Sequence, residues 1–222
     1  MGTGVIVTII AAVIILIIIG AISAHIWEKK RREGMAAWAA AKGFKFNPER
    51  DHGIDRRYHV FDCFNNGRNR YGYNIMEGIF HDMEICAFDY RYTTGSGKHR
   101  TTHNLSIVIV NAATHLKKLL IRPEGLWDKL AGAVGFNDID FADSPEFSKK
   151  FYVKSPDEAW AREVLTPALR QHLLNHPKFV LEFGQNNLMI CKKRRFDIAG
   201  YEAAFLFLEG VLDRLPEKLW TG

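Results

Sequence analysis

Cysteine is scarce in this chain, and the three cysteines, Cys63, Cys86 and Cys191, stand far apart. No Cys-x-x-Cys pair is present, and an odd number of widely spaced cysteines excludes both a disulfide framework and a structural zinc site. We therefore expect three small buried thiols in a protein of a reducing compartment.

Charge is absent from the first 27 residues, which contain no Asp, Glu, Lys or Arg. Residues 5–22 are almost entirely Val, Ile, Leu and Ala, and a helix of about 20 such residues crosses the hydrocarbon core of a bilayer. A cleaved signal peptide fits less well, because it has positive charge before a shorter apolar segment and small residues before its cleavage site. Residues 1–27 are thus predicted to be a transmembrane anchor.

The residues that follow the anchor predict its orientation. Lys29, Lys30, Arg31 and Arg32 come directly after it, and basic flanks stay on the cytoplasmic side of a membrane. The sequence therefore predicts a single-pass protein of the bacterial inner membrane, with its N-terminus outside and residues 44–222 in the cytoplasm. The four basic side chains are predicted to contact lipid headgroups, each contributing about 1 kcal/mol.

The chain has only a small excess of positive charge. Its 30 Lys and Arg residues against 25 Asp and Glu residues give a net charge of +5. So modest a balance does not indicate nucleic acid. The expected partners are the lipid bilayer and either another protein or a second copy of this chain. A second basic run at 192–195 is interpreted as the solvated end of a strand, in preference to a second contact with lipid.

The sequence after the anchor predicts a sheet. Residues 28–43 are rich in Ala, Lys, Arg and Glu and predict a basic juxtamembrane helix that ends at Gly43. Short runs of aromatic and β-branched residues then alternate with turns that contain Gly or Asn. Since no long helical pattern separates these runs, we expect antiparallel neighbours in one sheet. The expected strands are 58–64, 71–80, 83–92, 104–110 and 117–123.

Helical patterns dominate the rest of the chain, apart from a predicted hairpin of 179–183 and 188–192. Helices are expected at 123–134 and at 155–176, the second with Ser155 as its cap and a break at Pro167.

A last helix is expected after a cap at Asp197. Its apolar residues are spaced three and four apart, and we expect this broad stripe to pack on the sheet rather than to form a dimer interface. The stripe consists of Ile198, Tyr201, Phe205, Leu208, Leu212 and Leu215. The predicted fold class is α+β: an N-terminal transmembrane helix, then one mainly antiparallel sheet domain with a C-terminal packing helix.

Residues 95–98, Gly-Ser-Gly-Lys, resemble the end of a phosphate-binding loop. That motif requires a further Gly where this chain has Tyr92, a Ser or Thr where it has His99, and a helix where the sequence predicts a strand. Because all three requirements fail, the segment is predicted to be a hairpin turn that binds no nucleotide.

Basic side chains nevertheless gather around this turn. They are interpreted as a solvated loop, and a surface for a protein partner or for lipid is the alternative. The residues are Arg91, Lys98, His99, Arg100 and His103.

Motifs for metals and catalysis are missing. His99 and His103 lie in a loop without the Glu of a zinc protease, and the acidic stretch 138–146 lacks the Gly and terminal Glu of a calcium loop. No Gly-x-Ser-x-Gly is present, and no Gly-x-Gly-x-x-Gly opens a helix after a strand. We therefore predict no cofactor, no metal and no catalytic residue.

The segment 88–98 followed by Thr102-His103 and an apolar strand resembles a stretch in a family of uncharacterised bacterial membrane-anchored proteins. Later segments of that family are similar to 121–126, 138–141, 144–147 and 165–167, in the same order, so that the resemblance covers most of residues 30–215. It implies a single N-terminal transmembrane helix with a cytoplasmic α+β domain, and it implies no functional residues.

The predicted function is that of a non-enzymatic, membrane-tethered cytoplasmic module that binds a protein or the lipid surface. The alternative is a hydrolase-like enzyme whose site is assembled from the acidic loop 138–146 and the hairpin 91–103.

Overall fold

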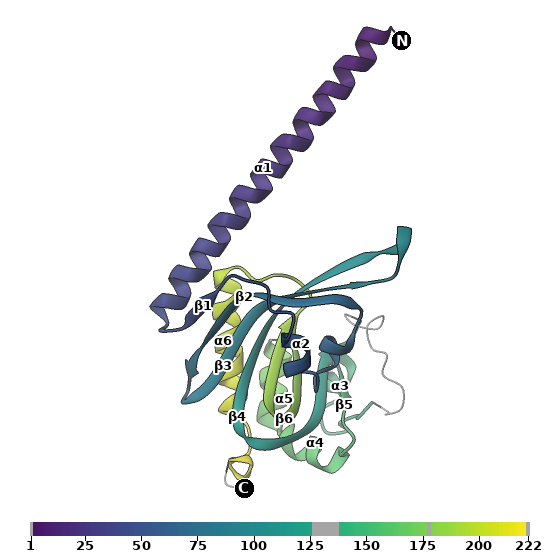
Figure 1. The fold of residues 1–222 in the computed structure, drawn as a ribbon. Helices are drawn as coiled ribbons and strands as arrows, with labels where there is room; N and C mark the ends of the chain where they lie inside the picture. The colour runs from purple at the N-terminus through teal and green to yellow at the C-terminus, as the bar shows by residue number, and fades with distance from the viewer. Residues whose placement is uncertain (1, 126–137, 177–178, 221–222) are drawn as a thin grey trace.

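A single helix of 39 residues, α1 (Thr3–Ala41), leaves the domain and extends far beyond it (Figure 1). The computed structural model describes residues 2–125, 138–176 and 179–220. α1 is long and apolar enough to cross a membrane, and its most apolar stretch is not buried at all. Its last turns instead pack on the domain through Met35, Trp38 and Ala39. The predicted anchor and the predicted juxtamembrane helix are therefore one unbroken helix.

The domain is built on one antiparallel sheet of six strands, in the order β1-β2-β3-β4-β5 with β6 also paired to β4. This confirms the predicted α+β class. The strands are β1 (Lys45–Asn47), β2 (Arg68–Phe80), β3 (Met83–Thr94), β4 (Thr101–Pro123), β5 (Phe151–Lys154) and β6 (Val180–Lys192).

The long strand β4 organises the sheet. It pairs with β3 along 101–110 and with β5 along 120–123, while β6 runs beside it from 106 to 121. Leu120 has partners in both β5 and β6, so these two strands lie on opposite edges of β4. Ala113 adopts a left-handed conformation with φ of 51° where the register with β6 shifts, as at a β-bulge. The runs 104–110 and 117–123, predicted as two strands, are thus one.

Two other strand predictions were wrong. Residues 58–64 form no strand, since 58–61 follow the short helix α2 (Ile54–Arg57) and 62–64 belong to the 3-10 turn η1 (Asp62–Asn65). Their aromatic residues cover the sheet instead of joining it, with Phe61 and Phe64 buried. Residues 179–192 form no hairpin, because β4 offers a continuous edge along which β6 pairs throughout. The polar residues at 184–187 lie at an irregularity of the strand, where Gln185 has φ of 55°.

Three helices begin near predicted positions: α4 (Glu158–Val164), α5 (Pro167–Asn175) and α6 (Ile198–Leu212). The short helix α3 (Pro145–Lys150) was not predicted. Thr166 and Asp197 cap α5 and α6 with their side chains, which confirms the predicted break and the predicted last helix.

One helix prediction needs correction, and another lies mostly outside the described residues. Asp157, and not Ser155, caps α4 by accepting a hydrogen bond from the amide of Trp160. The Ser155 hydroxyl donates to the carbonyl of Lys118 instead, because β4 lies beside it. For the helix predicted at 123–134, Pro123 ends β4, and residues 126–134 are outside the described residues.

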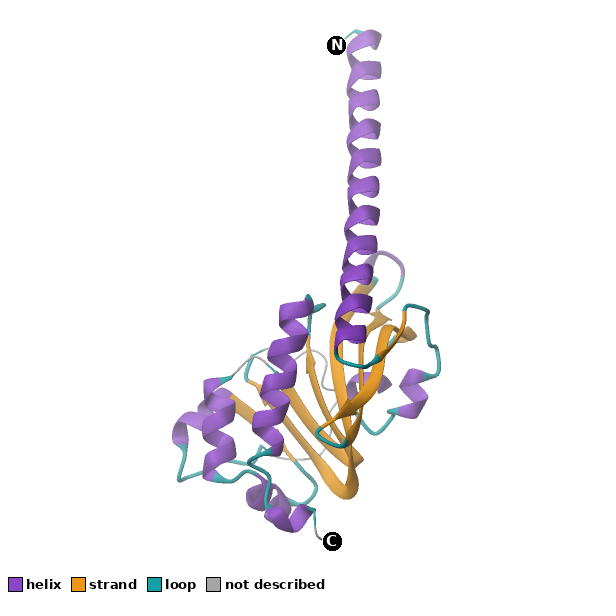
Figure 2. Cartoon of the chain, turned by 90° about the vertical axis from the view of Figure 1, so that its left-hand side faces the viewer, coloured by secondary structure: helices purple, strands orange, loops and turns teal. Residues whose placement is uncertain are grey.

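Helices lie on both sides of the sheet (Figure 2). The larger core joins one face of the sheet to the end of α1 and to α4, α5 and α6, and the smaller core packs α2 and η1 on the opposite face. All three cysteines are buried and free, as predicted. Two further 3-10 turns, η2 (Gly97–His99) and η3 (Glu217–Leu219), complete the chain.

Candidate functional site

The joint between α1 and the sheet is a buried ion pair. Arg31 of α1 donates from both terminal nitrogens to the two carboxylate oxygens of Asp89 in β3, at 2.7 and 3.0 Å. The same guanidinium also donates to the carbonyl of Phe196, just before α6, at 2.6 Å. Only 7% of the Arg31 side chain and none of Asp89 is exposed. The pair therefore ties three separate parts of the chain together.

Three further side chains satisfy Asp89. Asn74 donates to it at 3.0 Å from an irregular part of β2, where φ of Asn74 is 52°, a left-handed conformation that Asn tolerates. Ser106 of β4 donates at 2.7 Å, and Tyr201 of α6 donates at 3.3 Å. Burial and the charge of Asp89 raise the pKa of Tyr201 well above its usual value, so the phenol keeps its proton and remains a donor.

A second contact lies one turn closer to the N-terminus of α1. Arg195 forms an ion pair with Glu28 at 2.7 Å, and its guanidinium stands 5.2 Å from the centre of the Trp27 ring. Trp27 is the last residue of the uncharged segment. The run 192–195 thus reaches α1 where the predicted anchor ends. The interpretation of this run as a solvated strand end did not predict a contact with α1.

The predicted headgroup residues do not share one environment. Lys29, Lys30 and Arg32 differ from Arg31, because Lys29 and Lys30 are exposed whereas the Arg31 side chain points into the domain. Arg32 is likewise exposed, and the Nζ atom of Lys29 lies 3.9 Å from the carboxylate of Glu33. The prediction that Arg31 contacts lipid was wrong, since a buried carboxylate is its partner.

The predicted turn at 95–98 is confirmed as the connection between β3 and β4. The end of this hairpin extends past the rest of the sheet, on the same side of the domain as the projecting part of α1 (Figures 1 and 2). Arg91, Lys98, His99 and Arg100 are exposed there. His103 is different, because its ring stacks on Tyr92 at 4.7 Å, and burial and the charge of Lys193 lower its pKa.

A small, open cavity of about 500 Å³ lies beside this hairpin. One wall is formed by residues 101–104 at the start of β4, and the other by Lys193, Arg194 and Arg195 after β6. The second wall is held in place by hydrogen bonds to Ser106, whose amide donates to the carbonyl of Arg194 at 3.0 Å and whose hydroxyl accepts from the amide of Phe196 at 2.8 Å.

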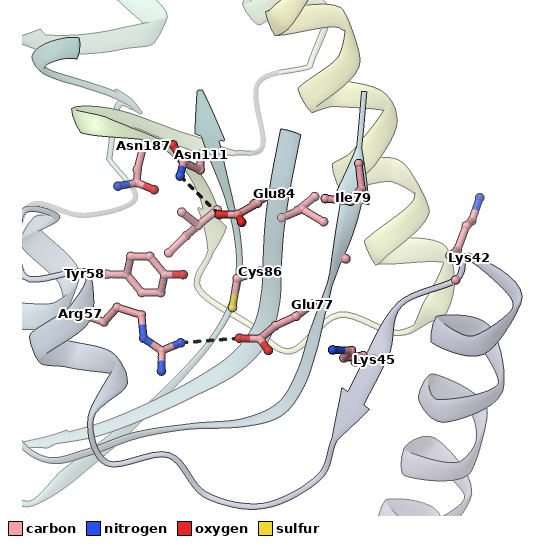
Figure 3. A pocket seen from close by; sticks show the side chains of 14 residues that line it. Lys42, Lys45, Arg57, Tyr58, Glu77, Ile79, Glu84, Cys86, Asn111 and Asn187 are labelled. Atoms are coloured by element: carbon pink, nitrogen blue, oxygen red, sulfur yellow. Dashed lines mark hydrogen bonds and ion pairs between the residues drawn. The ribbon is translucent and has the colours of Figure 1, made fainter. Parts of the chain in front are cut away.

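A larger, open groove of about 850 Å³ lies on the face of the sheet near α2 (Figure 3). Arg57 and Glu77 form an ion pair across it at 3.6 Å, and Cys86 and Tyr58 line its floor. Burial raises the pKa of the Cys86 thiol to about 12. Since the thiolate is the nucleophilic form, this cysteine is not activated for catalysis.

The two segments of the alternative enzyme site lie at opposite ends of β4. The hairpin precedes Thr101, whereas Asp138 accepts a hydrogen bond from the amide of Val153, which pairs with Ile121. Asp143 pairs with Arg170, and Glu146 pairs with Lys150. Within the described ranges no group of His, Cys, Asp and Glu is placed to hold a metal ion. The structure does not bring the proposed acidic and basic segments into one site.

The hairpin geometry predicts that Lys98→Ala changes neither the stability of the chain nor its binding of nucleotides. Because Lys98 is exposed in a turn, the variant is expected to keep its free energy of unfolding within about 0.5 kcal/mol of the parent chain. Neither protein is expected to bind ATP or GTP in calorimetry. Saturable, magnesium-dependent binding that this substitution abolishes would contradict the hairpin interpretation.

Glu182 predicts a pH-dependent stability. It is 1% exposed in β6, accepts from the amide of Asp62 at 3.1 Å, and lies 3.8 Å from Lys118. Burial, followed by the charge of Asp62, raises its pKa from about 4.5 to about 8. Between these values the folded chain keeps a proton that the unfolded chain has released, so stability falls as pH rises, by up to about 1.4 kcal/mol per pH unit.

Urea unfolding of the parent chain and of Glu182→Gln at pH 5, 6.5 and 8 measures this contribution. We expect the variant to gain stability relative to the parent chain across this range, because its amide cannot ionise. A constant difference between the two proteins would show that Glu182 does not titrate in this window.

The sequence did not identify the residues around Arg31. Asp89 is the one charged residue in the run from Ile85 to Tyr90, and a charge inside so apolar a strand needs a partner when it is buried. That signal predicts a buried pair but not its partner, because Arg31 is 58 residues away in the chain.

No family model matches the chain, and no curated protein matches it in sequence. Among solved structures, the crystal structure of the mycobacterial trehalose monomycolate transport factor A, TtfA, is similar, with a TM-score of 0.62 and 13% sequence identity. The similarity covers 84% of this chain and 96% of the TtfA chain. At this identity the comparison shows a shared fold. The membrane-anchored architecture that the family resemblance implied agrees with the apolar length of α1.

Proposed function

We propose that this chain is a non-enzymatic, single-pass membrane protein whose α+β domain binds the surface of the bilayer that anchors it. The observation that supports this best is that basic residues from 29–32, 91–103 and 192–195 gather on the side of the domain from which α1 projects (Figure 1). Arg31 is the exception, since it belongs to the buried joint.

The short distance between anchor and domain supports the same proposal. Arg31 is the fourth residue after Trp27, which places it about 6 Å further along the helix. The exposed basic residues of 29–32 therefore lie within about one Debye length of the headgroups at physiological salt. Each exposed Lys or Arg at that distance contributes about 1 kcal/mol of attraction to an anionic leaflet.

We further propose that the domain is cytoplasmic and the membrane is the bacterial inner membrane. The basic flank of α1 supports this topology. A reporter fused after Gly222 is expected to be active only if it works in the cytoplasm. Activity of a reporter that requires the periplasm would reverse the topology.

Spin labels on the full-length chain in lipid nanodiscs test the surface contact. The three native cysteines are buried, so a label can be attached selectively at Ser96→Cys in the hairpin or at Glu217→Cys in η3. With a nickel-chelating lipid in nanodiscs that contain phosphatidylglycerol, we expect strong relaxation of the Ser96 label and little of the Glu217 label. Equal relaxation at both positions would contradict the proposal.

Binding of a protein partner is the second candidate. It is favoured by the groove of Figure 3, which combines paired charges with the exposed side chain of Ile79, 60% accessible at its rim. TtfA is named as a transport factor, and a role of this chain in transport is an analogy of fold. A photo-crosslinking residue at position 79 is expected to capture a specific protein in cells, whereas one at position 217 is not.

A further inference from the structure

We infer that the small cavity between residues 101–104 and 193–195 binds the phosphate of an anionic phospholipid headgroup. The inference rests on the proposed function, because the cavity meets lipid only if the domain lies on the bilayer. It names one site and one ligand class within the broader basic surface.

The level of the cavity relative to the membrane is fixed by Arg195. This residue lines the cavity, and it also contacts Trp27 and pairs with Glu28 at the end of the uncharged part of α1. Trp side chains favour the boundary between hydrocarbon and headgroups. The wall formed by Arg195 is therefore attached directly to the helix turn that emerges from the bilayer.

The chemistry of the lining suits a phosphate monoanion. Lys193, Arg194 and Arg195 supply positive charge, Thr101 and Thr102 supply hydroxyl groups, and no Asp or Glu is among the lining residues. A guanidinium presents paired N–H donors that match phosphate oxygens. Nε2 of His103 is hydrogen-bonded to the Thr94 hydroxyl at 2.7 Å and the pKa of its ring is lowered, so this ring adds no further charge to the lining.

The cavity is also preorganised. Its two walls are joined through Ser106, whose amide and hydroxyl hold the backbone at Arg194 and Phe196. Arg195 is restrained on its other side by Glu28. A preorganised site loses less conformational freedom on binding than mobile surface lysines do. This distinguishes it from the hairpin tip, whose basic residues are exposed in a turn.

Native mass spectrometry of the full-length chain in detergent micelles, with dioleoyl phosphatidylglycerol as the added probe, tests the site. Neutralising Lys193→Gln and Arg194→Gln together is expected to weaken binding of the first lipid by about tenfold or more. A matched pair loses the same charge elsewhere: Lys149→Gln with Lys150→Gln in α3 is expected to change the affinity by less than about twofold.

Three results would overturn the assignment. Equal weakening by both pairs would show attraction to net charge without a site, and an unchanged affinity in the 193/194 variant would place the lipid elsewhere. Displacement of the lipid by an equal concentration of inorganic phosphate would assign the cavity to the free anion. If any of these occurs while the Ser96 label still lies at the headgroups, the cavity proposal fails and the proposed function stands. If the label is also remote, both fail.

Discussion

Phe205→Asp is expected to unfold the domain. Phe205 is 7% exposed on α6. The centre of its ring lies 5.0 Å from the ring centre of Phe80, 5.6 Å from that of Trp38 and 5.8 Å from that of Phe44. Truncating a buried Phe alone costs about 3–5 kcal/mol, and an unpaired carboxylate at this position adds a desolvation cost. The sum approaches the whole stability of a typical domain, about 5–15 kcal/mol.

The neighbouring residue provides the control. Leu206 is 67% exposed, so Leu206→Asp is expected to change stability by less than about 0.5 kcal/mol. Near-ultraviolet circular dichroism of the full chain in micelles is the suitable measurement, because α1 keeps its far-ultraviolet signal when the domain unfolds. A native spectrum for Phe205→Asp with halved mass in light scattering would instead establish α6 as a dimer interface.

Asp89→Asn is expected to lower the free energy of unfolding by about 3–5 kcal/mol. The substitution keeps the shape of the side chain but leaves the guanidinium of Arg31 buried without its counter-charge. It also weakens the hydrogen bonds that Asn74, Ser106 and Tyr201 donate to the carboxylate. Because Asp89 holds α1 to both β3 and α6, the loss is expected to loosen the helix from the domain.

Glu84→Gln is the matched control on the same strand. Glu84 is exposed, and the hydrogen bond that it accepts from Asn111 is long, at 3.5 Å. Urea unfolding monitored by tryptophan fluorescence compares the variants. Adding Arg31→Met to Asp89→Asn is expected to recover part of the stability, because the uncompensated charge is removed. A loss below about 1 kcal/mol for Asp89→Asn would show that water reaches the pair.

Local patterns in the sequence predicted most of the elements but not their pairing. The break at Pro167, the cap at Asp197, the turn at 95–98 and the apolar stripe of α6 all depend on neighbouring residues, and each is confirmed. The hairpin predicted at 179–192 was wrong because Gly and Asn favour a turn locally, whereas β4 supplies a longer partner edge from 60 or more residues away.

The candidate site shows the same division. The positive charge of 29–32 and 192–195 is visible in the sequence, and its location at one end of the domain is not. Arg31 is indistinguishable from its basic neighbours by composition. Only the helical phase of α1 and the position of β3 decide that this side chain turns inward while Lys30 remains exposed.

The unbroken course of α1 couples the domain to the thickness of the membrane. The 23 residues from Val5 to Trp27 span about 34 Å as a helix, against a hydrocarbon core of about 30 Å. A span longer than the bilayer can be accommodated by a tilt of the helix. Since no hinge interrupts the helix before Met35 packs on the sheet, the domain inclines with it. In a thinner bilayer the hairpin tip therefore swings through a larger angle, and the lipid composition of the membrane sets the orientation of the domain.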